Sequence, residues 1–209
     1  MVSLPNARAY LLRRAASATH TQPMRDIVKE LTPSLIEAGF GGSGRTWRRT
    51  EGDFVFVISF DGAADGFYIN LGAHPTFIPA EGQAEPDAAT LKEYECALRS
   101  RVGDKWKWTM SDREIAALGA ELGAAHATFF AHAGSLPKAI ETESAEKLMD
   151  QFCRGTPPAR AALHLARAGL ALGQRAKAAK LAKRGLELAG EHAKGLQSEL
   201  RIALETASN

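Results

Sequence analysis

The sequence has little cysteine and no long hydrophobic run, and both absences narrow the class of protein. Cys96 and Cys153 are its two cysteines and lie far apart in the chain, so no disulfide framework is expected and both thiols are interpreted as buried and reduced. No apolar stretch reaches the roughly 18 residues that a membrane-spanning helix needs. We therefore expect a soluble, cytoplasmic protein that does not contact a membrane.

The residue patterns of common catalytic and metal sites are also missing. The chain has no Gly-x-x-x-x-Gly-Lys-Ser/Thr loop, no Gly-x-Ser-x-Gly elbow, no His-Glu-x-x-His and no Cys-x-x-Cys. His126 and His132 are six residues apart, which places them on different sides of a helix. His74 and Cys96 lack a recognisable third ligand. No catalytic residue, metal or cofactor is predicted.

Charge divides the chain into three blocks. Residues 1–23 hold three bases and no acid, residues 24–150 hold 13 bases and 20 acids, and residues 151–209 hold 10 bases and 4 acids. The first block is interpreted as a flexible arm or as a start assigned too early, because it lacks the apolar centre of an export leader. An acidic body is therefore joined to a basic tail.

The body shows the pattern of an α+β domain over residues 24–153. Apolar residues recur at helical spacing over 24–39 and alternate over five extended segments, 46–50, 53–61, 67–72, 94–102 and 105–110. Short connections predict an antiparallel sheet of about five strands packed against helices, with 53–61 as a central strand covered on both faces. Residues 41–44 are predicted to form a turn and 75–89 an irregular excursion. Ser111 and Glu114 form a capping box, and a further helix is expected over about 137–153.

A helical extension is predicted over residues 157–207, after the linker Gly155-Thr156-Pro157-Pro158. The pattern indicates a hairpin of two helices, about 159–172 and 175–189, and one further helix. Small residues along the hairpin resemble a single tetratricopeptide unit. Because such arrays need about three repeats to be stable alone, we expect the hairpin to pack on the body or on a second chain.

Several motifs of the body resemble one uncharacterised family, domain of unknown function 4304. The motifs are Gly39-Phe40, 44–49, the aromatic strand 54–60, 67–72, 96–101 and Asp104-Lys105-Trp106. The resemblance covers roughly residues 24–150 and implies no activity. Asp61 stands where members of the family commonly have Gln, and the tail is not part of the family pattern. Some members resemble proteins of bacterial toxin–immunity neighbourhoods, which implies binding more than catalysis.

One face of the predicted sheet carries a candidate ligand-binding set: Tyr68, Asn70, His74, Arg99 and Arg101. If Phe67, Ile69, Leu71, Cys96 and Leu98 face the helices, these five side chains share the opposite surface. Two arginines that are two residues apart on a strand are suited to gripping a carboxylate or phosphate. The simpler interpretation is a solvated sheet face on which the arginines pair with acids.

The tail carries a candidate partner-binding set on its second helix: Lys177, Lys180, Lys183 and Arg184. These cations are suited to RNA, to an acidic partner or to the acidic body of the same chain. The body as a whole repels phosphates. Docking on the chain itself, or a solvated face, is therefore the favoured interpretation, and nucleic acid is not the expected partner.

Three functions follow in order of preference. The first is a non-catalytic binding or adaptor protein, for which the family resemblance implies the immunity-protein kind, and whose C-terminal helices bind a protein partner or a second copy. The second is an enzyme or binder that acts on an anionic small molecule at the Arg99/Arg101 face. The third is nucleic-acid binding through the basic tail.

Overall fold

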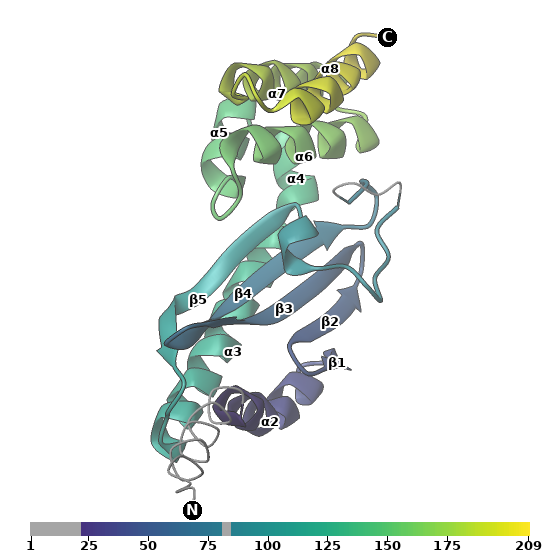
Figure 1. The fold of residues 1–209 in the computed structure, drawn as a ribbon. Helices are drawn as coiled ribbons and strands as arrows, with labels where there is room; N and C mark the ends of the chain where they lie inside the picture. Colours follow the sequence, from purple (N-terminus) through teal and green to yellow (C-terminus); the bar gives the residue numbers. More distant parts are fainter. Residues whose placement is uncertain (1–21, 81–84) are drawn as a thin grey trace, which may run out of the picture.

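The computed structural model describes residues 22–80 and 85–209, so the arm predicted over 1–23 lies almost wholly outside the described residues. Five strands form one antiparallel sheet in the order β1-β2-β3-β4-β5 (Figure 1). Their bounds are β1 Gly41–Ser43, β2 Thr46–Glu51, β3 Phe54–Ala63, β4 Gly66–Pro75 and β5 Leu98–Lys107. Helices follow the sheet in the chain, so the protein has the α+β fold expected from its sequence.

The central strand β3 is buried on both faces, as its continuous apolar pattern predicts. Its phenylalanines join the main core beneath helix α3, while Val55 and Val57 face the other way into a small second cluster. The partners of these valines come from the excursion between β4 and β5, which contributes Leu91 and Cys96 and contains the 3-10 helix η1 (Glu93–Glu95). Part of the second sheet face is therefore covered by the chain itself.

Two strand predictions were wrong. Residues 41–43 form the short strand β1 instead of a turn, and the segments 94–102 and 105–110 give way to the single strand β5. In β5, Val102 pairs with Ile69 and Trp106 pairs with Phe67, so residues 103–105 stand opposite one residue of β4. Gly103 has φ 57°, and this left-handed residue allows a bulge instead of the predicted reversal.

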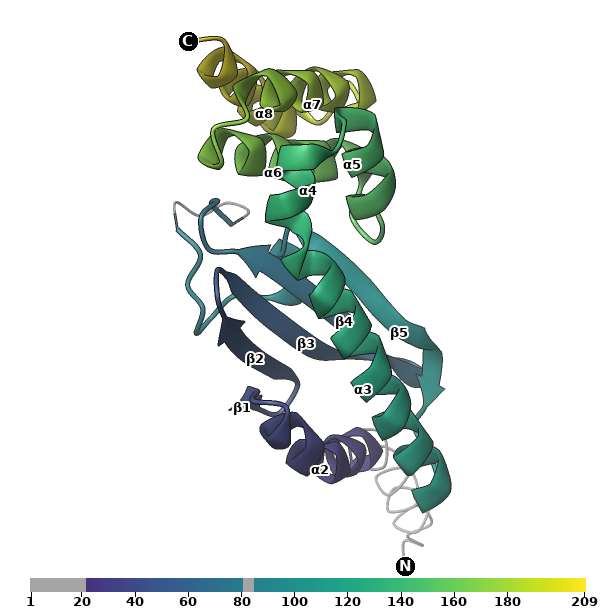
Figure 2. The ribbon, with the colours of Figure 1, turned by 180° about the vertical axis from the view of Figure 1, so that it is seen from behind.

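The helices of the body pack on one face and at one end of the sheet. Helix α2 (Gln22–Glu37) continues through Pro33 and lies beside the first half of α3 (Asp112–Gly134), which crosses the sheet diagonally (Figure 2). The Ser111–Glu114 capping box begins α3 as predicted. The single helix expected over 137–153 is two helices, α4 (Leu136–Thr142) and α5 (Ala145–Phe152), because Ser144 adopts an extended conformation and caps α5.

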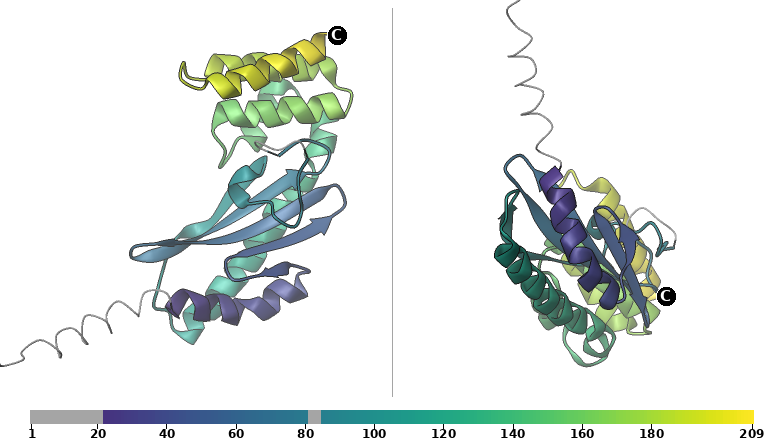
Figure 3. Two further views of the ribbon diagram at one scale, coloured as in Figure 1. Left: turned by 45° about the vertical axis from the view of Figure 1, so that its right-hand side comes forward. Right: turned by 90° about the horizontal axis from the view of Figure 1, so that it is seen from below.

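The tail forms the predicted hairpin, α6 (Pro158–Ala171) and α7 (Arg175–Leu188), followed by α8 (Lys194–Ser208). Gly169 packs against Ala178, and Gly185 packs against Ala162 and Leu200, so small residues set the close approach of these helices. The three helices stack at one end of the sheet (Figure 3). The hairpin thus packs on the body of its own chain, while its tetratricopeptide likeness stays a prediction.

Candidate functional site

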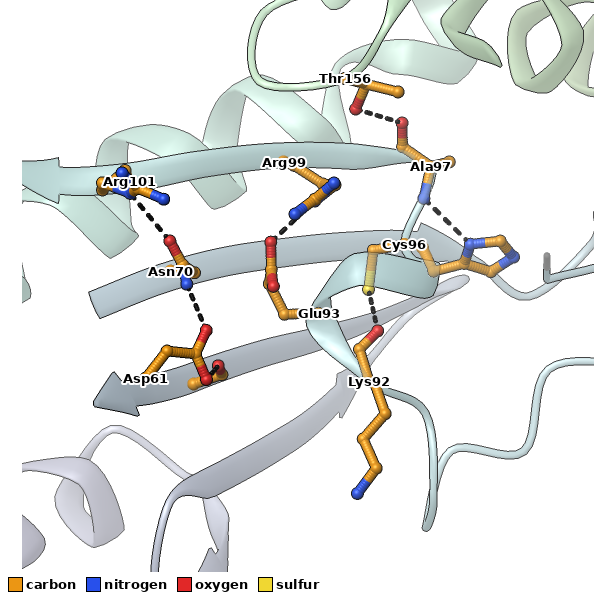
Figure 4. Close-up of polar contacts among 11 residues, drawn as sticks. Asp61, Asn70, Lys92, Glu93, Cys96, Ala97, Arg99, Arg101 and Thr156 are labelled. Carbon is orange, nitrogen blue, oxygen red and sulfur yellow. Dashed lines mark hydrogen bonds and ion pairs between the residues drawn. The ribbon is translucent and has the colours of Figure 1, made fainter. Parts of the chain in front are cut away.

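The open part of the sheet face opposite α3 carries a cluster that we call the polar row. It consists of Ser59 and Asp61 on β3, Tyr68 and Asn70 on β4, and Arg101 on β5. Ser59 pairs with Asn70 and Asn70 pairs with Arg101 in the strand register. Because alternate residues of a strand point to the same face, these side chains share one face of three adjacent strands. Figure 4 shows Asp61, Asn70 and Arg101 of this row.

Hydrogen bonds fix the polar row from end to end. Arg101 Nε donates to Asn70 Oδ1 at 3.0 Å, and Asn70 Nδ2 donates to Asp61 Oδ2 at 2.5 Å. Ser59 Oγ donates to the other carboxylate oxygen of Asp61 at 3.0 Å. The Asn70 side chain is 7% exposed, while Asp61 and Arg101 are exposed. One buried amide thus holds a negative and a positive group at the surface.

Arg101 is also held from beneath by an aromatic ring. Its guanidinium carbon lies 4.2 Å from the centroid of the Tyr68 ring, a distance at which the ring attracts a cation. The bond to Asn70 uses Nε, so the two terminal nitrogens of the guanidinium group remain on the solvent side for a second partner. Arg101 therefore has a fixed orientation before any partner arrives.

Arg99 does not join Arg101 in a common anion site. Its Nε donates to Glu93 Oε1 at 2.7 Å, and Glu93 on η1 is 5% exposed. Burial raises the pKa of Glu93, and the neighbouring Arg99 opposes that rise. The two arginines hold different partners (Figure 4), so the predicted joint grip on one carboxylate or phosphate is not present.

His74 is not on the open surface, contrary to its predicted place in the ligand-binding set. It is fully buried: its Nδ1 accepts from Ala97 N–H at 3.1 Å, and its Nε2 lies 3.1 Å from the carbonyl oxygen of Ile78. Burial lowers the pKa of His74. The ring joins β4 to both ends of the excursion, which makes it a structural residue of that surface.

Cys96 also lies on the face opposite to the predicted one. It packs with Val55 and Val57 instead of facing the helices, because η1 precedes it and β5 begins only at Leu98. Its Sγ donates to Lys92 O at 3.4 Å, and burial raises the pKa of the thiol well above its usual range. Both cysteines are free.

Of the four cations of the tail, Lys177 is bound to the body, while Lys180, Lys183 and Arg184 are exposed at a cleft beside α5. Lys177 Nζ donates to the carbonyl oxygens of Ile140 and Glu141 at the end of α4. Lys180, Lys183 and Arg184 line a cleft of about 780 Å³ between α5 and α7, whose other wall carries Glu146 and Asp150. Arg184 also pairs with Glu187 at 2.8 Å. The basic helix is therefore turned toward acidic residues and helix ends of its own protein.

Clefts of the described chain lie away from the polar row. One, of about 760 Å³, runs between α3, β5 and the end of α5 and has Arg99, Phe129 and Phe152 among its walls.

In the described ranges no helix is long and apolar enough to cross a membrane. The same residues contain no group of three or more His, Cys, Asp or Glu side chains placed to hold a metal ion.

Three residues of this surface were missed from the sequence. Ser59 was given no role, and Asp61 was noted only as a departure from the family pattern. Glu93 was missed because the excursion was predicted to end in a strand. The alternation of 53–61 was the available signal for the first two, since it places Ser59 and Asp61 on one face.

Comparison with known proteins places this surface within a known domain. Residues 31–122 match the family model described as Domain of unknown function (DUF4304). This segment is a DUF4304 domain. The match runs from within α2 to the middle of α3 and includes all five strands, so the polar row belongs to the DUF4304 domain and the tail lies beyond it. Neither curated proteins nor solved structures gave a significant match.

Proposed function

We propose that this protein is a non-catalytic binding protein that recognises a protein partner through the polar row of its DUF4304 domain. The observation that carries the proposal is the fixed, exposed guanidinium group of Arg101, stacked on Tyr68 and held by Asn70. Fixing a side chain before binding lowers the entropy that association costs. Tyr and Arg are also the residue types that contribute most often to the energetic centre of protein interfaces.

The geometry favours binding over catalysis. Arg99 and Arg101 hold separate partners, and neither the cleft beside α3 nor the cleft between α5 and α7 includes Arg101. An enzyme acting on a small anion needs convergent groups in a concave site. The row instead presents Asp61 and Arg101, one charge of each sign, on an open face. Opposite charges on a partner would complement this arrangement.

The basic charge of the tail indicated a partner-binding surface, but its contacts support a structural role. Lys177 binds carbonyl groups at the end of α4, and the remaining cations face the acids of α5. Charges that are engaged within the chain contribute less to binding an external acidic partner or RNA. We therefore assign recognition to the sheet face and assign the tail a structural role, in which it packs against one end of the sheet.

Affinity capture with the full-length chain tests the proposal. Arg101→Glu reverses the exposed charge, and Tyr68→Ala removes the ring beneath Arg101. Proteins retained by the unmodified chain should be retained at least about tenfold less by either variant, the loss expected when one central contact is removed. Circular dichroism establishes that each variant is folded.

The matched control is Lys194→Glu, which reverses an exposed charge at the start of α8. It should retain the same proteins as the unmodified chain. Retention of those proteins by Arg101→Glu and Tyr68→Ala, with loss in Lys194→Glu, would refute the polar row as the recognition surface and move recognition to the tail.

A further inference from the structure

Two buried histidines meet where the tail packs on the sheet. His74 comes from the end of β4 and is 0% exposed, and His164 comes from α6 and is 3% exposed. Their ring centroids are 6.2 Å apart and the rings are nearly perpendicular, at 88°. The contact therefore joins the DUF4304 domain to the C-terminal helices through two groups that can take up a proton near neutral pH in water.

The hydrogen bonds of His74 require a neutral ring. Ala97 N–H donates to Nδ1, so Nδ1 carries no proton, and Nε2 carries the proton that it donates to the carbonyl oxygen of Ile78. A second proton on His74 would set an N–H group against the N–H group of Ala97. The sheet side of the contact is thus built around an uncharged imidazole.

The surroundings of His164 disfavour a charged ring even more strongly, because neither of its ring nitrogens has a hydrogen-bond partner within residues 22–80 and 85–209. A charged imidazolium without partners is strongly disfavoured in a buried position. Burial, together with the smaller effects of the nearby His74, Arg167 and Arg160, lowers the pKa of His164 to about 3. In the docked arrangement His164 is therefore neutral at ordinary pH.

The charged groups facing this pair do not compensate a proton on His164. Arg160 and Arg167 belong to α6 itself and are both positive, and Arg167 is paired with Glu199 of α8 at 2.5 Å. On η1, Glu95 acts on His74 and favours its protonation. On α7, Lys177 is turned to the end of α4. Of the two anions named from the described residues, Glu199 is thus paired with Arg167 and Glu95 acts on His74.

We propose that His164, held against the neutral His74, is an acid-sensitive latch between the C-terminal helices and the sheet. When His164 takes up a proton, α6 separates from the end of β4, and the bond from Thr156 Oγ1 to Ala97 O at the same junction is lost. The sheet and the α6–α8 bundle each stay folded. This latch does not depend on the polar row being a binding surface.

The direction and range of the response follow from the two states. An imidazole released to water has a pKa of about 6.5, whereas the docked ring resists protonation until about pH 3. Between these limits each fall of one pH unit favours the separated state by up to about tenfold for each proton taken up. Above pH 6.5 His164 is neutral in both states, so a change of pH no longer favours the separated state.

Hydrogen exchange of the full-length chain between pH 7 and 4 tests the latch, with labelling times scaled to the intrinsic pH dependence of exchange. Amides at the start of α6 and at residues 96–98 should lose protection in acid, while β3 and α7 stay protected. In His164→Phe, which keeps an apolar ring and takes up no proton, this loss should occur at least one pH unit lower. His192→Phe, the same change at an exposed histidine, should behave like the unmodified chain.

The latch is overturned if His164→Phe loses protection at the same pH as the unmodified chain, or if all regions lose protection together. Should the variant fail to fold, NMR titration of the histidine rings in the unmodified chain decides the matter. Protonation of His164 that coincides with loss of protection in α6 supports the latch. Protonation near pH 6.5 with α6 fully protected, or loss of protection with His164 still neutral, overturns it.

Discussion

A single amide sets the geometry of the polar row. Asn70 accepts from Arg101 and donates to Asp61, so its two ends serve groups of opposite charge on the two flanking strands. An aspartate at position 70 would lack the donor that Asp61 requires, and a leucine would lack both functions. The orientation of the exposed charges is therefore a property of a side chain that is itself almost completely buried.

Arg49 is a second side chain whose orientation is fixed by several partners, and it is partly buried at the edge of the core. Its guanidinium carbon lies 5.3, 5.5 and 5.7 Å from the rings of Phe40, Phe56 and Phe130. Its terminal nitrogens bind Ala38 O at 2.8 Å and Glu51 at 2.6 Å. A planar guanidinium group meets all these partners at once, whereas an ammonium group is a single point charge.

We therefore expect Arg49→Lys to lower the free energy of unfolding by about 1–2 kcal/mol, the sum of a lost cation–π contact and a lost hydrogen bond. Urea unfolding followed by tryptophan fluorescence measures the change. Arg184→Lys alters an arginine that pairs with Glu187 on the tail surface and should leave stability nearly unchanged. Equal effects of the two substitutions would show that the aromatic contacts of Arg49 contribute nothing.

Glu93 predicts a pH dependence of the opposite sign to that of His164. Burial raises its pKa in the folded protein above the value of 4.5 expected in water, so the folded state binds the proton more tightly than the unfolded state. The contribution of Glu93 to stability is thus fully present below pH 4.5 and falls as pH rises through the raised pKa.

Glu93→Gln removes this titration. Relative to the variant, the unmodified chain should lose stability between pH 4.5 and 7, by no more than about 1.4 kcal/mol for each pH unit. Urea unfolding of both proteins across this range gives the difference directly. A difference that is constant with pH, or that grows in favour of the unmodified chain, would contradict the raised pKa.

At the scale of elements, β5 forms one exposed edge of the sheet. It is the edge strand next to β4, and its bulge at residues 103–105 interrupts the regular ladder. At its other end Gly155 lies against Arg99, so that a Cβ at position 155 would meet Arg99 O at 2.3 Å. The exposed edge of the sheet is therefore shortened at both ends, which limits its pairing with other chains.

Gly155→Ala should destabilise the junction between body and tail by about 1–3 kcal/mol, because it combines φ 78° with this close approach. Two matched variants separate the causes. Gly173 has φ 73° and open space around it, so Gly173→Ala should lower the free energy of unfolding by about 1 kcal/mol. Gly195 lies at an exposed position of a helix, so Gly195→Ala should be neutral or stabilising. Thermal unfolding ranks the three, and a Gly155 variant no worse than Gly173→Ala would exclude the contact with Arg99.

At the scale of the whole molecule, polar and apolar contacts attach the tail to the body. Thr156 binds Ala97 O, Lys177 binds the carbonyl groups at the end of α4, and His164 contacts His74. Apolar side chains of α6 join the continuous main core. Separation of the tail from the body would expose less buried surface than complete unfolding.

Lys177→Met tests this attachment, since it keeps most of the apolar stem and removes the donors and the favourable charge at the end of α4. Hydrogen exchange should become faster at the end of α4 and the start of α7, with a stability loss of about 1 kcal/mol. Lys194→Met, on the exposed start of α8, should change neither quantity. Unchanged exchange in Lys177→Met would show that the apolar contacts alone hold the tail.

Features that depend on neighbours in the chain were predictable from the sequence alone. A continuous apolar run identified β3 as a doubly buried strand, the Ser111–Glu114 pair began α3, and Gly173 ended the first tail helix. The paired placement of Asn70 and Arg101 on one face also followed from alternation. These signals are short-range, because side-chain direction and capping involve residues within about four positions of one another.

Only the tertiary structure decided which of those side chains meet. Arg101 and Asn70 are 31 residues apart, and His74 and Ala97 are 23 apart, so their contacts depend on strand register and on the path of the excursion. The turn of η1 moved Cys96 to the other face and gave Arg99 a partner of its own. Composition showed an acidic body and a basic tail, but burial, which depends on packing in three dimensions, made two histidines the contact between them.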